Sequence, residues 1–446
     1  MKKLFTLVSL AIVYQGLAQA PAEKWDLRKC IDYAVKNNIS VKQADVQART
    51  AALQLKQAKL YQYPTASFST GVGPQFGRSI DPTTNQFTTT QLLYQNYNLQ
   101  GNAQLYNWGR LKNNVISNRF SAEAALVDIE KAANDVSLNV ATYYLQVLAA
   151  KEQVHISEVQ IAQTQAQLDI TKKRVDAGAL PELNQVELEA QLSSDSSNYY
   201  NSKTIFVQNV LSLKALLNLD AAALFEVETP SADKIPLESF ADLDPEAVYK
   251  LALTTQPQQR SNDLKIKAAE KNVLSNKGGL FPTIGGSYSL ASTFNDKATT
   301  FTGNKLHYFD QLNQNFRQSL GLGLSIPIFN NGQNRIAYEQ SKLNLKNTLL
   351  QKEQADVTLK NNIYTAYSNA VNAFEKFNAG KKSVESAQKA YDFAVKRYEI
   401  GLLSTIDLIT NQNNLLKAKL QQVANQYDYV FKMKLLEFYK GQGLKL

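Results

Sequence analysis

The stretch RYEIGLLSTIDL at residues 397–408 decides the fold, because its beginning has a counterpart 223 residues earlier, RVDAGAL at residues 174–180. In each copy the glycine closes a proline-free run that starts 69 residues before it, at Gly109 or Gly332. A helix of that length would extend about 100 Å at 1.5 Å per residue. Because a repeat at fixed spacing indicates a duplicated architecture, the sequence predicts two similar halves, each built on a very long helix.

Before each long helix the pattern changes from helical to period two. Residues 64–108 and 282–331 are rich in Thr, Ser, Gly, Asn and aromatic residues. The clearest alternation is at 320–328, where Leu and Ile take every second position. Each half therefore supplies two strands of roughly ten or more residues joined by a polar loop, a length that suits a membrane-spanning strand. Alternation of apolar with small polar residues suits lipid on one face and water on the other.

The number of strands constrains the assembly. Four strands cannot close around a water-filled lumen. An open sheet in lipid would leave backbone groups unpaired at both edges, which the bilayer does not tolerate. If the strands span a membrane, several chains must therefore share one barrel.

The long helices carry heptad spacing near their closing glycines, which predicts antiparallel coiled-coil hairpins with a polar, wet seam. In the long helices the seam positions are Val154, Ser157, Ile161, Thr164, Leu168, Thr171 and Val175, and Val384, Ala387, Tyr391, Ala394 and Tyr398. In the return helices they are Leu183, Val186 and Ala190, and Ile406, Ile409, Asn413, Leu416, Leu420, Val423, Tyr427 and Val430.

Bulk properties point to an exported protein. Residues 1–18 have the charged start, short apolar stretch and small-residue end of a secretory signal. No other segment approaches 18 apolar residues, so no transmembrane helix is expected. Cys30 is the one cysteine, which excludes a disulfide within the chain. The net charge of +9 is scattered and not arranged as a stripe, which together with export argues against nucleic-acid binding.

Residues that carry enzyme chemistry are missing from the pattern. His155 and His307 are the two histidines, and neither stands near a cluster with metal-ligand spacing. The Gly-x-Gly pairs at 71–73 and 321–323 fall in strands and not before a helix, so they are not phosphate loops. The sequence therefore indicates no enzyme, no cofactor and no metal site.

The turns and the strand exits resemble those of the TolC-type outer-membrane efflux family. Residues 174–180 and 397–403 are similar to the family's Arg-aromatic-x-x-Gly turn, and the second copy continues into Asp407-Leu408 as the family does. The strand exits YNWGR at 106–110 and FNNGQ at 329–333 resemble the family's apolar-x-x-Gly lead into a long helix. The similarity covers nearly the whole mature chain, and the order of the motifs is more specific than any one of them.

The resemblance implies a mainly α fold with membrane β-strands. Three identical chains would pool four strands each into a twelve-stranded α/β-barrel channel in the outer membrane of a Gram-negative bacterium, with the helices forming a periplasmic tube. This homotrimer would contact outer-membrane lipid and export small molecules or polypeptides, as in multidrug efflux or type I secretion. Its helical tips would dock to a periplasmic adaptor and an inner-membrane pump of RND or ABC type. The docking residues expected from the motif are Arg174, Gly178, Ala179, Leu180, Arg397, Gly401, Leu402 and Leu403.

The resemblance also implies a periplasmic gate. Family members place acidic rings at the tip that contribute to closure and to cation preference. Asp407 matches the first acidic position, while Thr410 replaces the second and Asn184 is the counterpart in the first half. Leu403 replaces the basic residue expected between glycine and acid, and Tyr398 completes the candidate gate. A ring of Asp407 carboxylates would repel one another and attract cations, but Asp407 could equally cap the return helix.

The expected organisation has two repeats and a linker. A signal at 1–18 is followed by the first repeat at 19–220, which has strands 65–107, long helix 109–177 and return helix 181–218. A linker at 221–243 leads to the second repeat at 244–446, which has strands 283–329, long helix 332–400 and return helix 404–440. The alternative function is a periplasmic coiled-coil scaffold or adhesin, which would be soluble without detergent.

Overall fold

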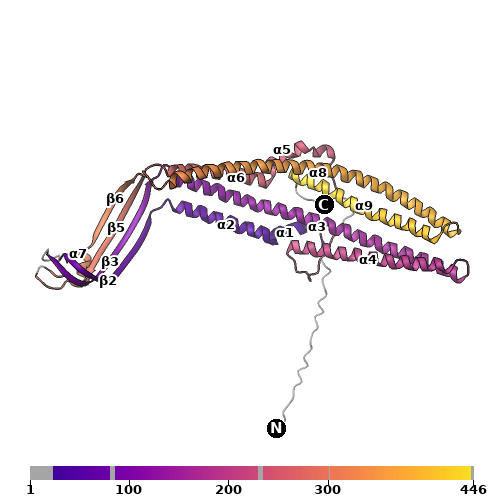
Figure 1. Ribbon diagram of the computed structural model, residues 1–446, viewed down its shortest axis with the longest axis horizontal. Coiled ribbons are helices and arrows are strands. Elements are labelled where there is room, and N and C mark those ends of the chain that lie inside the picture. The colour runs from indigo at the N-terminus through magenta and orange to yellow at the C-terminus, as the bar shows by residue number, and fades with distance from the viewer. Residues whose placement is uncertain (1–23, 81–85, 230–234, 301, 443–446) are drawn as a thin grey trace, which may run out of the picture. The chain divides into compact units, whose positions relative to one another are not determined.

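The computed structural model describes residues 24–80, 86–229, 235–300 and 302–442 (Figure 1). The predicted signal peptide lies outside these ranges, as does part of the predicted linker. The described chain divides into two compact units. None of the described helices is both long and apolar enough to cross a membrane.

The first unit, here the sheet unit, comprises residues 43–131 and 256–358. Its four-stranded antiparallel sheet has the order β2-β3-β5-β6 (Figure 1). The strands are β2 (Thr65–Ile80), β3 (Phe87–Tyr106), β5 (Thr283–Asn295) and β6 (Arg317–Ser325). The helices are α6 (Pro257–Gly278), α7 (Tyr308–Gln314), most of α2 (Ile39–Leu60) and the first parts of α3 (Arg110–Asp176) and α8 (Gln333–Glu399). The described residues add no fifth strand, so β2 and β6 are the edges of the sheet.

Strand register gives the sheet two chemically different faces. Tyr97 pairs with Thr70 on one side and Ser292 on the other, so residues at even steps from these share a face. That face carries large apolar side chains, namely Phe68, Val72, Phe76, Leu99, Tyr288, Leu290, Leu320, Leu322 and Leu324. The opposite face carries Ser67, Ser69, Asn96, Asn98, Gln100, Asn102, Ser287, Ser289 and Ser319, with several glycines. The predicted alternation is therefore present in β2, β5, β6 and the part of β3 that starts at Tyr97, whereas Leu92 and Tyr94 of β3 fall on the polar face.

The switch from strand to long helix is made in the same way in both halves. Trp108 and Gly109 both have positive φ, at 52° and 73°, and Asn331 and Gly332 repeat this at 54° and 75°. Positive φ is uncommon outside glycine and asparagine. Two such pairs at corresponding positions therefore indicate that both halves make the same turn. The Trp108 indole Nε1 donates to the Pro282 carbonyl at 2.7 Å and ties the first exit to the second strand pair.

The second unit, here the helical unit, contains the remaining parts of α3 and α8, together with α1 (Leu27–Asn37), α4 (Glu182–Leu217), α5 (Pro245–Thr255) and α9 (Thr405–Lys440). Both long helices have 67 residues and both return helices have 36. Two short strands, β1 (Lys24–Trp25) and β4 (Glu226–Val227), pair in parallel, and the 3₁₀ turn η2 (Phe240–Leu243) precedes α5. The helices of the sequence prediction are observed, while its division into repeats stays a prediction.

The seam of the long helices was predicted correctly, but the seam of the return helices was wrong next to the turns and correct farther along α9, where Val423 and Val430 are buried. Ser157, Thr164, Leu168, Thr171, Ala394 and Tyr398 are all buried. In α9, however, Ile406 is 60 % exposed, and in α4 Leu183 is 64 % exposed. The buried positions next to the turns are instead Thr405, Leu408, Gln412, Leu415 and Leu188. The register of α9 is displaced because Leu408 packs on Ala394 and Tyr398, which turns Ile406 outward.

A buried ion pair fastens the predicted linker to the end of α9. The Lys434 ammonium lies 2.8 Å from the Glu437 carboxylate, and both side chains are less than a tenth exposed. Lys434 also donates to the Pro236 carbonyl at 2.7 Å, and Glu437 accepts from the Glu238 backbone N–H at 3.2 Å. Since both charges are hydrogen-bonded to the linker, the pair holds that segment in place and avoids the cost of unsatisfied buried charge.

Candidate functional site

The two turns that close the long helices have the same backbone hydrogen bonds. In the first turn Gly178 N–H donates to the Val175 carbonyl and Ala179 N–H to the Arg174 carbonyl, both at 2.8 Å. In the second turn the equivalent bonds of Gly401 and Leu402 are 3.0 and 2.8 Å. This is the Schellman arrangement, which needs a left-handed residue after the helix. The glycine φ angles of 72° and 77° supply it, and the space beside each glycine is open, so the requirement is conformational.

The two arginines of the motif act on the turns themselves. The Arg174 guanidinium donates to the Glu399 carbonyl at 3.2 Å, so a side chain of α3 caps the last turn of α8. A cation at a helix C-terminus is favoured by the helix dipole. Arg397 donates within its own turn, to the Leu402 carbonyl at 3.4 Å. The Arg174 side chain therefore joins the first hairpin (α3 and α4) to the second hairpin (α8 and α9) beside the turns. Of the leucines in the two turns, Leu180 and Leu403 are half-buried and Leu402 is exposed.

Tyr398 is a second connection between the hairpins. Its ring is 3 % exposed and packs with Ala394 and Leu408 inside the second hairpin. Its hydroxyl lies 3.1 Å from the hydroxyl of Thr171 on α3, and the Thr405 hydroxyl donates to it at 3.5 Å. The Tyr398 ring thus packs within the second hairpin, while its hydroxyl contacts the first hairpin.

The structure places the other candidate gate residues at the starts of the return helices. Asp407 is exposed in the first turn of α9, where its backbone N–H donates to the N-cap hydroxyl of Ser404 at 3.2 Å and its carboxylate accepts from the same hydroxyl at 2.6 Å. Thr410 donates to the Ile406 carbonyl of its own helix at 2.8 Å. Asn184 is half-buried in α4. Asp407 therefore takes part in helix capping, and its carboxylate is still open to solvent.

Sequence reasoning missed a buried polar cluster several turns from the glycines. Asp195 of α4 is 1 % exposed, and one of its oxygens accepts from the Thr164 hydroxyl at 2.6 Å and the Gln160 amide at 3.3 Å. The other oxygen accepts from Gln191 at 2.7 Å. Gln412 of α9 donates to the Thr164 hydroxyl at 2.8 Å, so the cluster crosses from the first hairpin to the second. The polar seam positions were a signal, but they did not identify the acid they bind.

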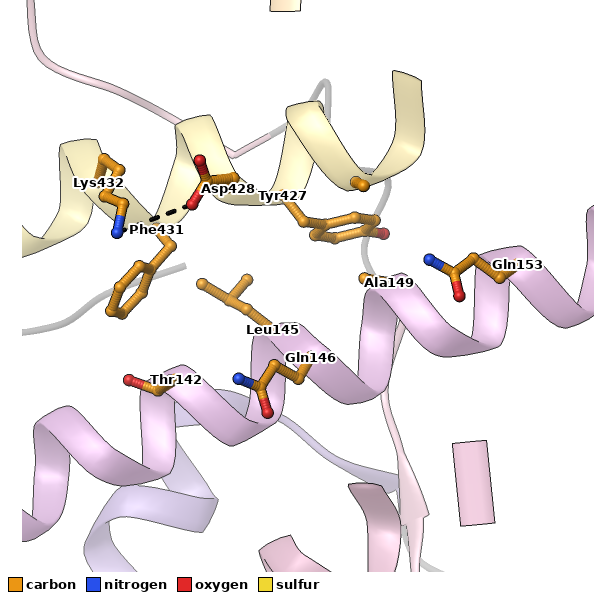
Figure 2. Close-up of a pocket in the computed structure, with 10 residues that line it drawn as sticks. Thr142, Leu145, Gln146, Ala149, Gln153, Tyr427, Asp428, Phe431 and Lys432 are labelled. Atoms are coloured by element: carbon orange, nitrogen blue, oxygen red, sulfur yellow. Dashed lines mark ion pairs between the residues drawn. The ribbon is translucent and has the colours of Figure 1, made fainter. Parts of the chain in front are cut away.

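A surface groove lies between α3 and α9 of the helical unit (Figure 2). It has a volume of about 340 Å³, and Leu145, Tyr427 and Phe431 lie beside it. At its edge Lys432 and Asp428 form an ion pair at 3.8 Å. Its walls combine apolar rings with amides, which is a surface for contact and not an arrangement for catalysis. Within the described ranges no three His, Cys, Asp or Glu side chains are grouped as metal ligands.

Comparison with solved structures places this architecture among outer-membrane channels. The crystal structure of the Campylobacter jejuni CmeC outer membrane channel matches 94 % of this chain and 86 % of its own, with a TM-score of 0.80 and 19 % identity. Two long helical hairpins, each preceded in the chain by a pair of strands, are thus the fold that this chain shares with an outer-membrane channel.

Sequence comparison identifies the family. The model of the outer membrane efflux protein family matches residues 30–219 and 248–439, and the chain belongs to that family. The outer membrane efflux protein BepC of Brucella suis is 23 % identical over 95 % of this chain and 87 % of its own. The outer membrane protein TolC of Escherichia coli strain K12 is 25 % identical over 66 % of this chain and 58 % of its own. The protein is therefore an outer-membrane channel of the TolC type for efflux or secretion, with a large periplasmic helical part.

Proposed function

We propose that three copies of this chain form one exit duct through the outer membrane. The observation that carries the proposal is the sheet, which has a lipid-compatible face, a polar face and unpaired edges at β2 and β6. Backbone groups at these edges need partners inside a bilayer. Pairing of β6 with β2 of the next copy satisfies them, and three copies give the twelve strands of a water-filled barrel.

The turns are the docking surface for a periplasmic adaptor. Ile400, Leu402 and Ile406 are 60 to 69 % exposed around the second turn, and two Schellman turns hold this apolar surface in a fixed shape. An adaptor that inserts its own apolar side chains there would couple the duct to an inner-membrane pump of RND or ABC type. The pump supplies the energy, since this channel needs only a continuous wet path for small molecules or polypeptides.

The polar links between the hairpins keep the periplasmic end closed. Three of them occur in succession, from Arg174 to the Glu399 carbonyl, between Thr171 and Tyr398, and from Gln412 to Thr164. Separation of the hairpins would break these bonds and hydrate their groups. The Asp407 carboxylates of three chains would form the ring that gives the opening its preference for cations.

Mass measurement in mild detergent tests the proposal. A particle with three times the chain mass, found in the outer-membrane fraction and converted to monomer by heating, is the expected result. A monomer or dimer that stays soluble in the periplasmic fraction without detergent would refute the duct. It would instead support the scaffold alternative, which family membership disfavours.

A further inference from the structure

The short helix α7 is fixed to the sheet at the end of β5, away from the long helices. The Ser292 hydroxyl donates to the Leu312 carbonyl at 2.7 Å. The rings of Phe294 and Tyr308 contact each other with centroids 4.7 Å apart. Tyr308 also hydrogen-bonds through its hydroxyl to that of Tyr97 on β3. The helix is therefore attached to two strands and is not a loose part of the loop (Figure 1).

The side chain of Gln311, a residue of α7, connects the helix to the end of β5 and to the loop between them. Its side chain is 2 % exposed, and its amide donates to the carbonyls of Asn295 at 2.9 Å and Leu306 at 3.1 Å. Its carbonyl accepts from the Asn295 backbone N–H at 2.9 Å. Since the buried amide has both donor and acceptor partners, it fixes where the loop begins and where the helix lies.

The attachment points show which face of the sheet α7 covers. Tyr97, Ser292 and Phe294 all belong to the apolar face by strand register. Phe316, just before β6, is in phase with Leu320 on the same face. The helix thus lies on the apolar face of the sheet, at the end of the strands that is farther from the long helices (Figure 1).

The exposed side chains of this region suit a membrane boundary. Phe309 on α7 is 79 % exposed and Phe316 is 52 % exposed. Aromatic side chains are enriched where acyl chains meet headgroups, because their rings are apolar and polarisable. Lys297 and Lys305 are exposed on the loop that leads to the helix, while the acid of that loop, Asp296, is half-buried and accepts from the Leu93 backbone N–H at 2.7 Å, and Asp310 is exposed on the helix itself. Two such cations favour negatively charged headgroups.

We propose that α7 is an interfacial anchor that inserts Phe309 and Phe316 into the outer boundary of the bilayer, with Lys297 and Lys305 contacting anionic lipid phosphates. The proposal rests on the proposed function, because it requires that the sheet spans the membrane. The anchor fixes the depth of the sheet at the end of the strands that is farther from the long helices (Figure 1). It also shields the buried Ser292 and Gln311 from lipid.

Spin labels can measure the depth of each position in the full chain. Cys30 is fully buried, so a label added to the folded protein attaches only to an introduced cysteine. The variants are Phe309→Cys and, on the same helix, Asp310→Cys. Leu322→Cys on the apolar face and Ser289→Cys on the polar face are the references for lipid and water. Each is reconstituted in vesicles of phosphatidylcholine with phosphatidylglycerol, and its collisions with oxygen and with a water-soluble nickel chelate are compared.

The expected oxygen-to-nickel accessibility ratio is highest at Leu322, severalfold above the water reference at Phe309, and close to water at Asp310. A water-like ratio at Phe309 with a lipid-like ratio at Leu322 would overturn the anchor and leave the channel intact. A water-like ratio at Leu322 would refute the membrane-spanning sheet and the anchor with it. Omission of phosphatidylglycerol should lower the immersion of Phe309, and no change would refute the contact of the lysines with anionic lipid.

Discussion

The link between the hairpins at Thr164 can be removed with almost no change in shape, by Thr164→Val. The hydroxyl donates to Asp195 at 2.6 Å and accepts from Gln412 at 2.8 Å, and all three side chains are at most 2 % exposed. Valine keeps the volume but removes the acceptor of the buried Gln412 amide hydrogen. An unsatisfied buried donor costs about 1–3 kcal/mol.

The two lost bonds have different consequences. The bond to Asp195 lies within the first hairpin, so its loss lowers stability whether the duct is open or closed. The bond from Gln412 crosses to the second hairpin and exists only while the hairpins are together. Its loss therefore shifts the equilibrium towards opening by about 5- to 150-fold. We expect more frequent open events in planar bilayers, and greater leakage of antibiotics into cells.

Thr204→Val is the matched control, because the exposed Thr204 hydroxyl of α4 bonds only to the Tyr200 carbonyl of its own helix among the bonds described here. It should leave opening unchanged. A Thr164→Val protein with a lower melting temperature but the same open probability as the control would refute the reasoning, since the cluster would then hold one hairpin together without restraining the gate.

Four further outcomes are expected. Gly401→Val should reduce cross-linking to the adaptor, because φ of 77° strains a β-branched residue, while Gly401→Asn should retain it; equal cross-linking would contradict the turn requirement. Asp407→Ala should lower cation preference in planar bilayers, and unchanged reversal potentials would exclude the ring. Burial raises the pKa of the Cys30 thiol to about 12, so Ellman's reagent at pH 8 should react only after unfolding, and prompt reaction would contradict this packing. The hydrogen bond from Lys440 lowers the pKa of Glu238 below its ordinary value of 4.5, so this carboxylate stabilises the fold above pH 4.5, and its contribution is lost as pH falls through the folded-state pKa. Glu238→Gln should therefore make acid denaturation below pH 4.5 less steep, and identical denaturation curves would contradict this role of Glu238.

The long-range architecture could be predicted from the sequence because it depends on local signals. Glycine at positive φ, period-two strands and proline-free runs each act within a few residues. Trp108 at positive φ was not foreseen, since tryptophan has no preference for that conformation and is held there by its bond to Pro282. Local signals therefore determine which elements form, while tertiary contacts determine the exceptions.

The seam of α9 shows why facing surfaces are harder to predict. Ile406, Ile409 and Asn413 fit a heptad as well as Thr405, Leu408 and Gln412 do, because a displacement of one residue keeps the spacing. Hydrophobicity alone favours the isoleucines. The structure selects the more polar set because its members have partners on other helices, and those partners lie far away in the chain.

The polar character of this seam has a consequence for a duct that must open. An apolar seam would lose its full burial energy when the hairpins part, and the closed state would be too stable for an adaptor to shift. Hydrogen bonds such as those of Gln412 and Tyr398 are exchanged for bonds to water on opening, so their net contribution is only about 0.5–1.5 kcal/mol each. The same bonds still specify one register in the closed state, because a mismatched seam would leave Asp195 buried without donors. Under the proposed function, a seam of this composition would be specific when closed and could be opened by the free energy of binding one partner protein.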